Sequence, residues 1–526
     1  MNPNYIKDYT RIVEEHNKHE TCPTLLPPSS SPPLPPHVIL VSSPPPGHSI
    51  PFLQAAKRLV DEGVTITYVS TDDHISKLLE SSNAASRELR SRGVRFVKLR
   101  DGLKHLSGSD FHRYVHSLEG ERNMIHLLEE VVVELLQSSD HLKESSDASS
   151  VAAAALQQRS TPCCLLYDMF STWSQEVADN HKLAKHLLFV SGAAQRLREE
   201  GLIPVAPQNR DVLITDIPGI PPFPARDLPG RMQGGPAFSD FLWTFSAYCQ
   251  STIILINTFQ SLEWRVLNAL PWFLQTQTIL EIGPLLLETN VQQDDEESEH
   301  HALNKAADEE QDMSILWLNM QPPSSVLYIA FGSHATLSAA QILELAQGLE
   351  ASNQSFLWVL RTPDQPSDSS SSSRHASGSV LPPGFKERTK ARGLCVSGWV
   401  PQKQILQHPA TGGFLSHCGW NSTMESICEG IPLLAWPLKA EQHMNCRFLV
   451  HTAKLAMEMK KDTDGFVSKQ EVERNIRALR EEVEGESIKS NMKEMRTLAR
   501  QAVAEGGTSK QNLQVYINYL RALQSP

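Results

Sequence analysis

The chain carries one stretch that decides the fold of its second half, and this stretch runs from Trp399 to Gln442 as WVPQKQILQHPATGGFLSHCGWNSTMESICEGIPLLAWPLKAEQ. Within it, residues 412–416 (GGFLS) are short and apolar enough to form a buried strand. Apolar side chains then recur at helical spacing at Met424, Ile427 and Cys428. The stretch therefore predicts a strand that is followed at once by a short helix.

The start of this predicted helix is suited to bind an anion. Asn421 or Ser422 is expected to cap the helix, and Gly430 is expected to end it. The free N–H groups and the dipole at a helix start attract negative charge. His417 lies beside that start, and Glu425 lies one turn deeper on the same face. This arrangement suits a pyrophosphate with a ribose beside it, whereas an ordinary core unit would not need these polar residues.

Length and composition set outer limits on the function. At 526 residues the chain is too long for one core, and two domains are expected. It is 40% hydrophobic and 21% charged, which is typical of a globular protein. Its formal net charge is −12 and it has no long basic run, which argues against a nucleic-acid partner. A phosphate ligand stays possible, because helix starts bind phosphate without lysine or arginine.

The cysteines and the N-terminus favour a soluble, cytoplasmic protein. The eight cysteines include no Cys-x-x-Cys pair, and Cys163 and Cys164 lie together in an apolar run that suits buried thiols better than disulfides or zinc. The first thirty residues are polar and then rich in proline, unlike a secretory signal. No run of about twenty apolar residues would span a bilayer.

The first half of the chain reads as alternating strands and helices. Residues 38–41 (VILV) and 64–69 (VTITYV) predict buried strands, and the helix between them makes a βαβ unit with a parallel sheet. Further strands are expected at 163–167, directly before Asp168, and at 187–190, directly before Ser191. The segment 202–232 is rich in proline and glycine and is expected to be irregular.

The second half repeats this alternation. A buried strand is expected at 325–331, ending at Gly332-Ser333, and the next strand is expected at 356–360 after a helix over 338–351. Ser468 and Glu471 read as a capping box for a later helix. The pattern predicts an α/β protein with two doubly wound, Rossmann-like domains.

These patterns divide the chain into five parts. They are a Pro/Ser-rich tail at 1–36, an N-terminal domain at 37–284, an acidic linker at 285–313, a C-terminal domain at 314–508 and a terminal helix at 509–526. A serine-rich insert at 364–379 is expected to carry no chemistry.

His48 and Asp168 are the candidates for catalysis. His48 is placed in the loop between the first strand and the first helix, and ligands of open α/β sheets bind outside the carboxyl ends of the strands. An imidazole with a near-neutral pKa suits removal of a proton from a hydroxyl group. Asp168 also ends a strand, so it is expected either to orient the imidazole or to cap the next helix.

One acidic pair does not fit a metal site. Asp462-Thr463-Asp464 has an Asp-x-Asp pattern, which holds a divalent metal in some enzymes of another fold. Here it is followed by Gly465 and lies far from any strand end, and an Asp-Gly pair marks a polar turn. No metal and no cofactor are expected.

The motifs resemble those of one family. Trp-x-Pro-Gln at 399–402, His-x-Gly-Trp-Asn-Ser at 417–422 and an acidic residue with glutamine at 441–442 resemble the signature box of the plant secondary-product glycosyltransferases that use UDP-sugars. Residues 47–51 (GHSIP) resemble the Gly-His-x-x-Pro of that family, and residues 331–333 resemble its Phe-Gly-Ser. The resemblance implies the GT-B arrangement, in which two domains face a cleft and the terminal helix crosses back to the first domain.

The resemblance also implies roles for individual residues. His48 would be the general base and Asp168 its partner. Ser191 would lie near the donor sugar, although it could be a simple turn residue. The acceptor site would be lined by the N-terminal domain, with Phe170 and Trp243 as candidates. The UDP-binding residues would be Ser333, Trp399, Val400, Gln402, His417, Asn421, Ser422 and Glu425, and the sugar-binding residues Ser191, Trp420, Glu441 and Gln442.

The reaction implied is transfer of glucose from UDP-glucose to a hydroxyl of a small lipophilic acceptor, with inversion, to give a β-O-glucoside. Gln442 resembles members that use glucose, whereas Glu441 departs from the aspartate common at that position and leaves the geometry of the sugar contact open. The acceptor would be a flavonoid, another phenolic, a terpenoid or a hormone, and the enzyme a monomer. Alternatives are another UDP-sugar donor, a UDP-sugar epimerase, or a silent UDP-sugar-binding protein.

Overall fold

The computed structural model describes residues 35–80, 84–99, 118–144, 161–191, 213–215, 219–229, 250–273, 278–287, 313–333, 335–361, 380–462 and 465–524. Trp243, the 364–379 insert, most of the tail and most of the acidic linker lie outside these residues.

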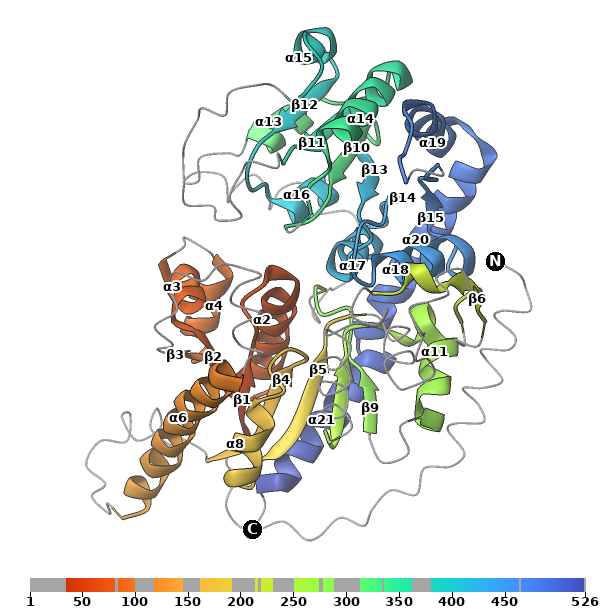
Figure 1. The fold of residues 1–526 in the computed structure, drawn as a ribbon. Helices are drawn as coiled ribbons and strands as arrows, with labels where there is room; N and C mark the ends of the chain where they lie inside the picture. Colours follow the sequence, from red (N-terminus) through yellow and green to blue (C-terminus); the bar gives the residue numbers. More distant parts are fainter. Residues whose placement is uncertain are drawn as a thin grey trace.

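The described part of the N-terminal domain is built on a parallel sheet of seven strands in the order β3-β2-β1-β4-β5-β8-β9 (Figure 1). β1 pairs with both β2 and β4, so the sheet reverses its direction of growth beside β1. Ligands of such sheets bind where the strand order reverses. The strands are β1 (His37–Val41), β2 (Thr65–Thr71), β3 (Arg95–Leu99), β4 (Pro162–Asp168), β5 (Ala184–Phe189), β8 (Ile253–Ile256) and β9 (Thr278–Glu281).

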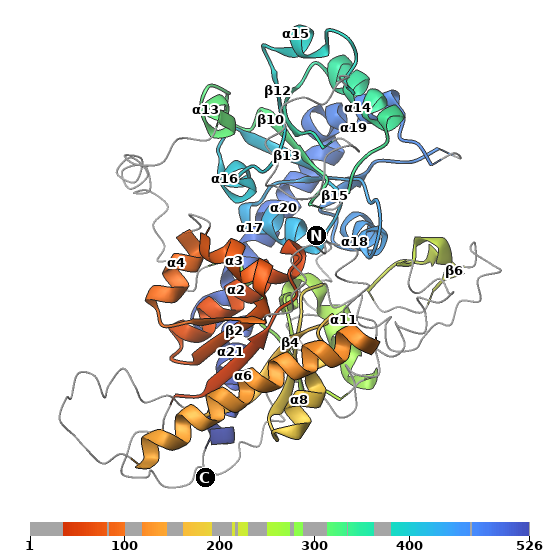
Figure 2. The same cartoon turned by 60° about the vertical axis from the view of Figure 1, so that its left-hand side comes forward.

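Both faces of this sheet are buried, which explains its apolar strands. Val38 and Leu40 of β1 pack on one side, and Ile39 and Val41 pack on the other. Figure 2 shows the long helix α6 in front of the sheet and the last helix of the chain, α21, behind it. The helices of this domain are α2 (Pro46–Asp61), α3 (Asp72–Glu80), α4 (Ala84–Ser91), α6 (Leu118–Glu144), α8 (Ser174–Asn180) and α11 (Gln260–Phe273).

The C-terminal domain repeats the plan with six parallel strands in its described part, in the order β12-β11-β10-β13-β14-β15. The strand order again reverses between two central strands, here β10 and β13. The strands are β10 (Val326–Ala330), β11 (Ser355–Val359), β12 (Gly393–Val396), β13 (Thr411–Ser416), β14 (Leu433–Ala435) and β15 (Ala456–Glu458). The helices are α13 (Met313–Asn319), α14 (Ala339–Ser352), α15 (Phe385–Thr389), α16 (Gln402–Gln407), α17 (Trp420–Glu429), α18 (Gln442–Arg447), a π-helical turn η3 (Phe448–Thr452), α19 (Lys469–Glu481) and α20 (Val483–Val503).

These two sheets confirm the predicted fold class of two doubly wound α/β domains. The last helix, α21 (Thr508–Gln524), leaves the C-terminal domain and lies along the N-terminal sheet (Figure 1). Its buried residues Leu513, Tyr516, Ile517 and Leu520 belong to the same core as β1 and β4. The N-terminal domain is therefore completed by the end of the chain.

A buried arginine binds the segment that leaves the N-terminal domain after β9. Arg58 of α2 donates to the backbone carbonyls of Ile282 and Leu287, each at 2.7 Å, and also to that of Pro284. The segment that leaves β9 therefore stays attached to α2 as far as residue 287, three residues beyond the predicted boundary.

The predicted cap of α17 is wrong. The helix begins at Trp420, its N-cap is Gly419, and neither Asn421 nor Ser422 caps it with a side chain. The helix starts earlier because Cys418 turns the chain with a φ of 64°, and one local and one distant contact hold that turn. The Cys418 N–H donates to Ser416 Oγ at 3.2 Å, and its carbonyl accepts from Asn445 Nδ2 at 2.9 Å. Asn421 and Ser422 lie in the first helical turn instead.

Three smaller expectations also need correction. His48 lies in the first turn of α2 rather than in a loop, because Pro46 starts the helix. The segment 202–232 is not wholly irregular, since β6 (Leu213–Ile214) and β7 (Phe223–Pro224) pair in antiparallel fashion. Ser468 caps α19 by accepting from the Glu471 N–H at 3.2 Å, but the Glu471 carboxylate bonds to Lys460, Arg474 and Asn475 instead of completing the capping box.

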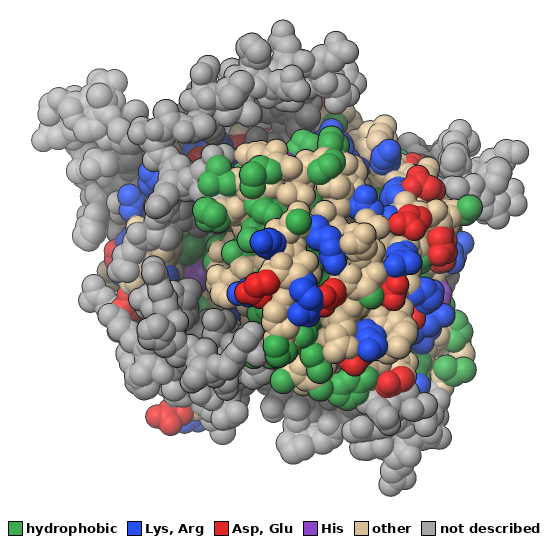
Figure 3. Space-filling view, turned by 90° about the horizontal axis from the view of Figure 1, so that it is seen from above, with side chains coloured by type: hydrophobic (Ala, Val, Ile, Leu, Met, Phe, Trp, Pro, Cys, Tyr) green, Lys and Arg blue, Asp and Glu red, His purple; other side chains and the backbone are tan. Residues whose placement is uncertain are grey.

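One face of the C-terminal domain carries charged side chains of both signs among its described residues. Figure 3 shows basic and acidic side chains of the described residues interspersed over the C-terminal domain. Within the described residues, no helix is long and apolar enough to cross a membrane.

Candidate active site

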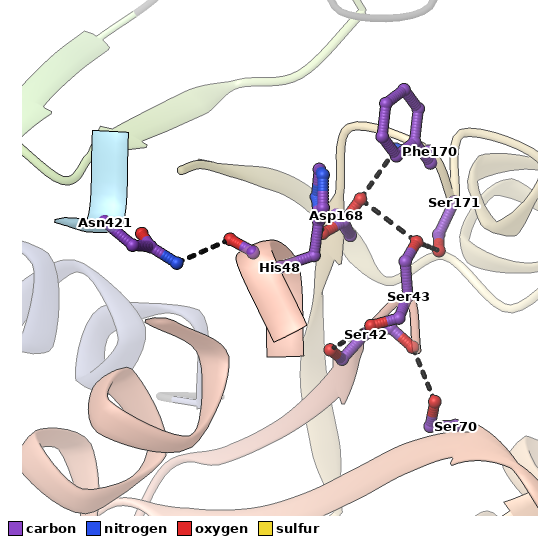
Figure 4. Close-up of polar contacts among 9 residues, drawn as sticks. Ser42, Ser43, His48, Ser70, Asp168, Phe170, Ser171 and Asn421 are labelled. Atoms are coloured by element: carbon purple, nitrogen blue, oxygen red, sulfur yellow. Dashed lines mark hydrogen bonds and ion pairs between the residues drawn. The ribbon is translucent and has the colours of Figure 1, made fainter. Parts of the chain in front are cut away.

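His48 and Asp168 form a hydrogen-bonded pair at the point where the N-terminal sheet reverses. His48 Nδ1 lies 2.8 Å from Asp168 Oδ2 (Figure 4). α2 presents the imidazole from its first turn, and β4 presents the carboxylate from its last residue. The His48 side chain keeps 16% of its surface exposed, whereas Asp168 is fully buried. The carboxylate thus fixes the ring orientation and leaves part of the ring accessible to a substrate.

Two further groups hold the second oxygen of Asp168. Ser43 Oγ donates to Asp168 Oδ1 at 3.1 Å, and the Phe170 N–H donates to the same oxygen at 2.7 Å. Ser171 Oγ lies 3.3 Å from Ser43 Oγ (Figure 4). The two serines were not predicted from the sequence. Ser43 follows β1 at the same edge of the sheet as Asp168, and that position was the signal that could have found it.

An aromatic ring lies against the imidazole. The ring centroids of His48 and Phe170 are 4.6 Å apart at an angle of 43°. Phe170 therefore borders the His48–Asp168 pair. Ser191 follows β5, next to β4 at the same edge of the sheet, and only 8% of its surface is exposed.

On the C-terminal side, three of the predicted UDP-binding residues contact one another. Gln402 Nε2 donates to Ser422 Oγ at 3.1 Å and also to the Glu425 carboxylate. Tyr328 of β10, which was not predicted, donates its hydroxyl to Gln402 Oε1 at 3.1 Å and so sets which end of the amide faces Glu425. Burial raises the pKa of Glu425 to about 6, although the hydrogen bond from Gln402 opposes this shift.

His417 follows β13 and is packed between two glycine backbones. A Cβ added to Gly332 or to Gly419 would lie within 2.6 Å or 2.5 Å of His417 Nε2, so no larger residue fits at either position without movement. The buried Nδ1 of His417 has no hydrogen-bond partner among the described residues. Burial lowers the pKa of His417 to about 4, and the charge of Lys439 adds to the shift. The ring is therefore neutral at physiological pH.

Trp399 and Ser333 are two further predicted UDP-binding residues of the C-terminal domain. Trp399 precedes α16 and exposes 67% of its surface, so its ring is available for stacking, whereas Val400 is buried. Ser333 follows β10, and its backbone carbonyl accepts from Arg361 Nη1 at 2.5 Å.

Two of the predicted sugar-binding residues, Trp420 and Gln442, make hydrogen bonds to other parts of the protein. Trp420 is buried, and its indole N–H donates to the Asn257 carbonyl of the other domain at 2.8 Å, so only its backbone could reach a ligand polar group. Gln442 Oε1 accepts the N–H groups of Leu438 and Lys439 at 3.0 and 2.9 Å, which leaves its NH₂ to donate. Burial raises the pKa of Glu441, and the charge of His48 opposes the shift.

A direct bond joins the two halves of the site. Asn421 Nδ2 donates to the Gly47 carbonyl at 2.9 Å, one residue before His48 (Figure 4). That carbonyl is available because Pro51, inside α2, has no amide hydrogen to donate to the residue four positions earlier. The proline of the Gly-His-x-x-Pro motif thus prepares a contact point for the other domain.

Comparison with known proteins identifies the family. A family model described as UDP-glucoronosyl and UDP-glucosyl transferase matches residues 260–503. UDP-glycosyltransferase 72B1 of Arabidopsis thaliana is 33% identical over 482 residues, covering 89% of this chain and 92% of that protein. The chain belongs to the plant UDP-glycosyltransferases. This glycosyltransferase is also 40% identical over 297 residues to phloretin 2'-O-glucosyltransferase of Pyrus communis, covering 54% of this chain and 59% of that protein.

Solved structures agree with this assignment. The glycosyltransferase matches Phytolacca americana UGT2, solved with UDP-2fluoro-glucose and pterostilbene, with a TM-score of 0.72 and 27% identity over 92% of this chain and 99% of that one. It matches a Polygonum tinctorium UDP-glucosyltransferase capable of glucosylating indoxyl with a TM-score of 0.73 and 27% identity over 93% and 99% of the chains.

Of the acidic pair of the glycosyltransferase at 462–464, only Asp462 is among the described residues. The Asp462 carboxylate accepts the Phe466 N–H at 2.8 Å, and Gly465 turns the chain with a φ of 82°. Across the described residues, no group of three or more metal-ligating side chains comes together. Thr463 and Asp464 lie outside those residues.

Proposed function

We propose that this glycosyltransferase moves glucose from UDP-glucose to a hydroxyl of a small lipophilic acceptor and forms a β-O-glucoside with inversion. The observation that supports this most is the His48–Asp168 pair at 2.8 Å, which the other domain approaches through the bond from Asn421 to the Gly47 carbonyl. The proposed base then lies beside the start of α17, where the UDP-sugar would bind.

The reaction would be a single displacement. His48 takes the proton of the acceptor hydroxyl, and Asp168 stabilises the imidazolium that forms. The acceptor oxygen bonds to the anomeric carbon as the bond from that carbon to the UDP oxygen breaks. The charge that develops on UDP faces the free N–H groups at the start of α17. Those groups do the work of a metal ion, so the proposal includes no metal.

Attack opposite to the leaving group inverts the anomeric centre, so an α-linked donor gives a β-linked product. Support for glucose comes from Gln442, whose fixed amide presents its NH₂ group as a donor to sugar hydroxyls. Support also comes from relatives whose names specify glucosyl transfer, among them the enzyme acting on phloretin.

Support for a flat, apolar acceptor comes from Phe170, whose ring packs on His48. An aromatic acceptor could stack on such a ring while its hydroxyl reaches the imidazole. The similarity to a structure that holds pterostilbene points to the same class of acceptor.

The test separates chemistry from binding. Replacing His48 with alanine (His48→Ala) is expected to lower kcat by about 10²–10⁴-fold, the usual worth of a general base, with UDP affinity within about twofold of the wild type. Turnover would be measured by mass spectrometry on pooled phenolics, terpenoids and hormones with UDP-glucose, UDP-galactose and UDP-xylose. UDP affinity would be measured by calorimetry.

His126→Ala is the matched control, because His126 is an exposed histidine of α6 with 71% of its side chain accessible. It should match the wild type in both assays. Equal loss of turnover and UDP affinity in His48→Ala would contradict the role of His48, and faster transfer from another UDP-sugar would contradict the choice of glucose.

A further inference from the structure

The start of α17 is bonded to the N-terminal domain at two consecutive residues. Trp420 Nε1 donates to the Asn257 carbonyl at 2.8 Å, and Asn421 Nδ2 donates to the Gly47 carbonyl at 2.9 Å. Figure 1 shows α17 at the boundary between the two domains. Among the described residues no side chain caps this helix, and its first two side chains bond across the boundary instead. The first turn of α17 is therefore docked on the other domain.

Of these two bonds, the one from Trp420 is the more deeply buried. Trp420 is 3% exposed and Asn257 is 1% exposed. The Trp420 side chain shares one apolar core with Phe259 and Leu262, which follow Asn257 in the N-terminal domain. A buried carbonyl that loses its partner costs free energy, because water does not replace the bond. The indole N–H therefore adds a specific tie to an apolar contact between the domains.

Asn257 offers this carbonyl from a fixed position. It follows β8 directly, and its N–H donates to the Phe189 carbonyl of β5 at 3.0 Å. Its side-chain Oδ1 accepts the Leu285 N–H at 3.0 Å. A Cβ added to Gly283 would lie 2.8 Å from that oxygen, so the segment that leaves the domain packs directly against Asn257. The acceptor of the Trp420 bond is thus braced from two sides.

The docked turn has a part in the proposed reaction. Its N–H groups would stabilise the charge that develops on UDP, and His48, one residue after Gly47, would remove the proton of the acceptor. The distance between the donor and the base then depends on how this turn sits on the N-terminal domain. A misplacement of about 1 Å can lower a rate by about a hundredfold.

We propose that Trp420 is a positioning residue, whose indole fixes the first turn of α17 against the N-terminal domain and so aligns the UDP-sugar with His48. This inference rests on the proposed function, because it takes the start of α17 as the site of the UDP phosphates. It assigns the Trp420 side chain to the domain interface and leaves its backbone for the ligand. The indole acts through the helix and does not touch the reacting atoms.

Trp420→Phe tests this role, because phenylalanine keeps an aromatic ring in the core and removes the N–H donor. The docked arrangement loses a buried hydrogen bond and becomes less populated, so kcat should fall by about five- to twentyfold. Trp399, Gln402 and Glu425 of the C-terminal domain are unchanged, so UDP affinity should stay within about twofold. Rates would be measured with whichever of UDP-glucose, UDP-galactose and UDP-xylose the wild type transfers fastest, and UDP affinity by calorimetry.

Trp358→Phe is the matched control for the loss of an indole. Trp358 of β11 is 1% exposed and lies in another core of the C-terminal domain. Its replacement should lower the melting temperature, as Trp420→Phe should, but should leave kcat within about twofold of the wild type. Loss of stability alone is thereby separated from loss of alignment.

Asn257→Ala tests the acceptor side of the same bond. It removes the side-chain bond to Leu285 but keeps the backbone carbonyl, so kcat should fall by about two- to fivefold. In the Trp420→Phe background the same change should add less than about twofold, because both changes act on one bond.

Hydrogen exchange of the Trp420 indole gives a readout that does not depend on turnover. In protein labelled at its tryptophan nitrogens, the indole N–H signal that disappears in Trp420→Phe belongs to Trp420. It should exchange slowly with solvent in the wild type and faster in Asn257→Ala, since a buried, bonded N–H exchanges only when the structure opens.

Several results would overturn the inference. They are a kcat of Trp420→Phe within about twofold of the wild type, a loss of UDP affinity equal to the loss of kcat, an equal loss of kcat in Trp358→Phe, or fast exchange of the Trp420 indole in the wild type. If Trp420→Phe does not fold, Asn257→Ala decides by the same comparison of kcat with UDP affinity. A wild type that transfers none of the three sugars would contradict the proposed function instead, while indole exchange would still decide whether the tie exists.

Discussion

The two domains place a histidine at the same point of their sheets, but they treat it differently. His48 follows β1 beside β4, and its Nδ1 faces Asp168, whose other oxygen is held by two further protein groups. His417 follows β13 beside β10, and its buried Nδ1 has no partner within the described residues. Protein groups therefore hold the Nδ1 of His48, whereas the Nδ1 of His417 has no such partner among the described residues.

The difference matches what each half has to do. A general base must be oriented before the acceptor arrives, so its support is built into the protein. A buried polar atom without a partner costs stability, and a ligand that supplies the missing hydrogen bond recovers that cost. Under the proposed function, a UDP-sugar would supply the missing partner of His417 Nδ1.

The largest effect is expected from substitutions in the N-terminal half of the site, which orient His48. Asp168→Asn keeps the shape but removes the charge that stabilises the imidazolium, so kcat should fall by about 10²–10⁴-fold. Ser43→Ala removes one hydrogen bond to the same carboxylate and should cost less, about three- to tenfold. Steady-state rates at saturating UDP-glucose measure both. A larger effect of Ser43→Ala than of Asp168→Asn would contradict this order.

An intermediate effect of pH on UDP-glucose affinity is expected through Glu425, in the C-terminal half of the site. The Glu425 carboxyl has a pKa of about 6, so it gains a proton as the pH falls through 6 and then accepts ribose hydroxyls less well. UDP-glucose affinity should be full above pH 7 and should fall by up to about tenfold per pH unit below 6. UDP-glucose is the suitable probe, because the terminal phosphate of free UDP itself titrates near pH 6.

Glu425→Gln serves as the control for this pH profile. It should bind UDP-glucose more weakly than the wild type at pH 7.5 and show no inflection near pH 6. His417, with a pKa of about 4, stays neutral throughout this range and does not contribute. Persistence of the inflection in Glu425→Gln would assign it to another group.

The smallest effect is expected where the two halves meet. Pro51→Ala adds an amide hydrogen that can bond to the Gly47 carbonyl within α2, in competition with Asn421. We expect kcat/KM to fall by about two- to fivefold, with UDP affinity unchanged. Pro46→Ala is the matched control, because Pro46 is the first residue of the helix and its missing N–H leaves no carbonyl unpaired. Equal effects of the two variants would contradict the coupling.

Local patterns in the sequence were sufficient to predict the architecture. Continuous apolar strands such as 38–41 point to parallel sheets buried on both faces, and the structure places their side chains alternately in two cores. The apolar run 163–167 placed Asp168 at a strand end, and the motifs placed His48 and the residues around α17 beside strand ends, because a strand end and a helix start are local features.

What the sequence could not show depends on contacts between distant residues. The cap of α17 was predicted wrongly because Asn445 fixes the Cys418 carbonyl from another helix. Ser43 and Tyr328 are single polar residues without a motif, and their contacts appear only when the chain brings Asp168 and Gln402 beside them. Trp420 carried a motif, yet its bond to Asn257 could not be inferred.

The return of α21 to the first domain has a consequence during synthesis. A nascent chain emerges from the ribosome N-terminus first, and early domains generally fold as they appear. Here Leu513, Tyr516 and Ile517 of α21, which follow the whole C-terminal domain in the sequence, cover one face of the first sheet together with α2. Until α21 has emerged, part of that face stays open to water and to other nascent chains, so a premature stop near residue 505 would leave a first domain that lacks part of its core.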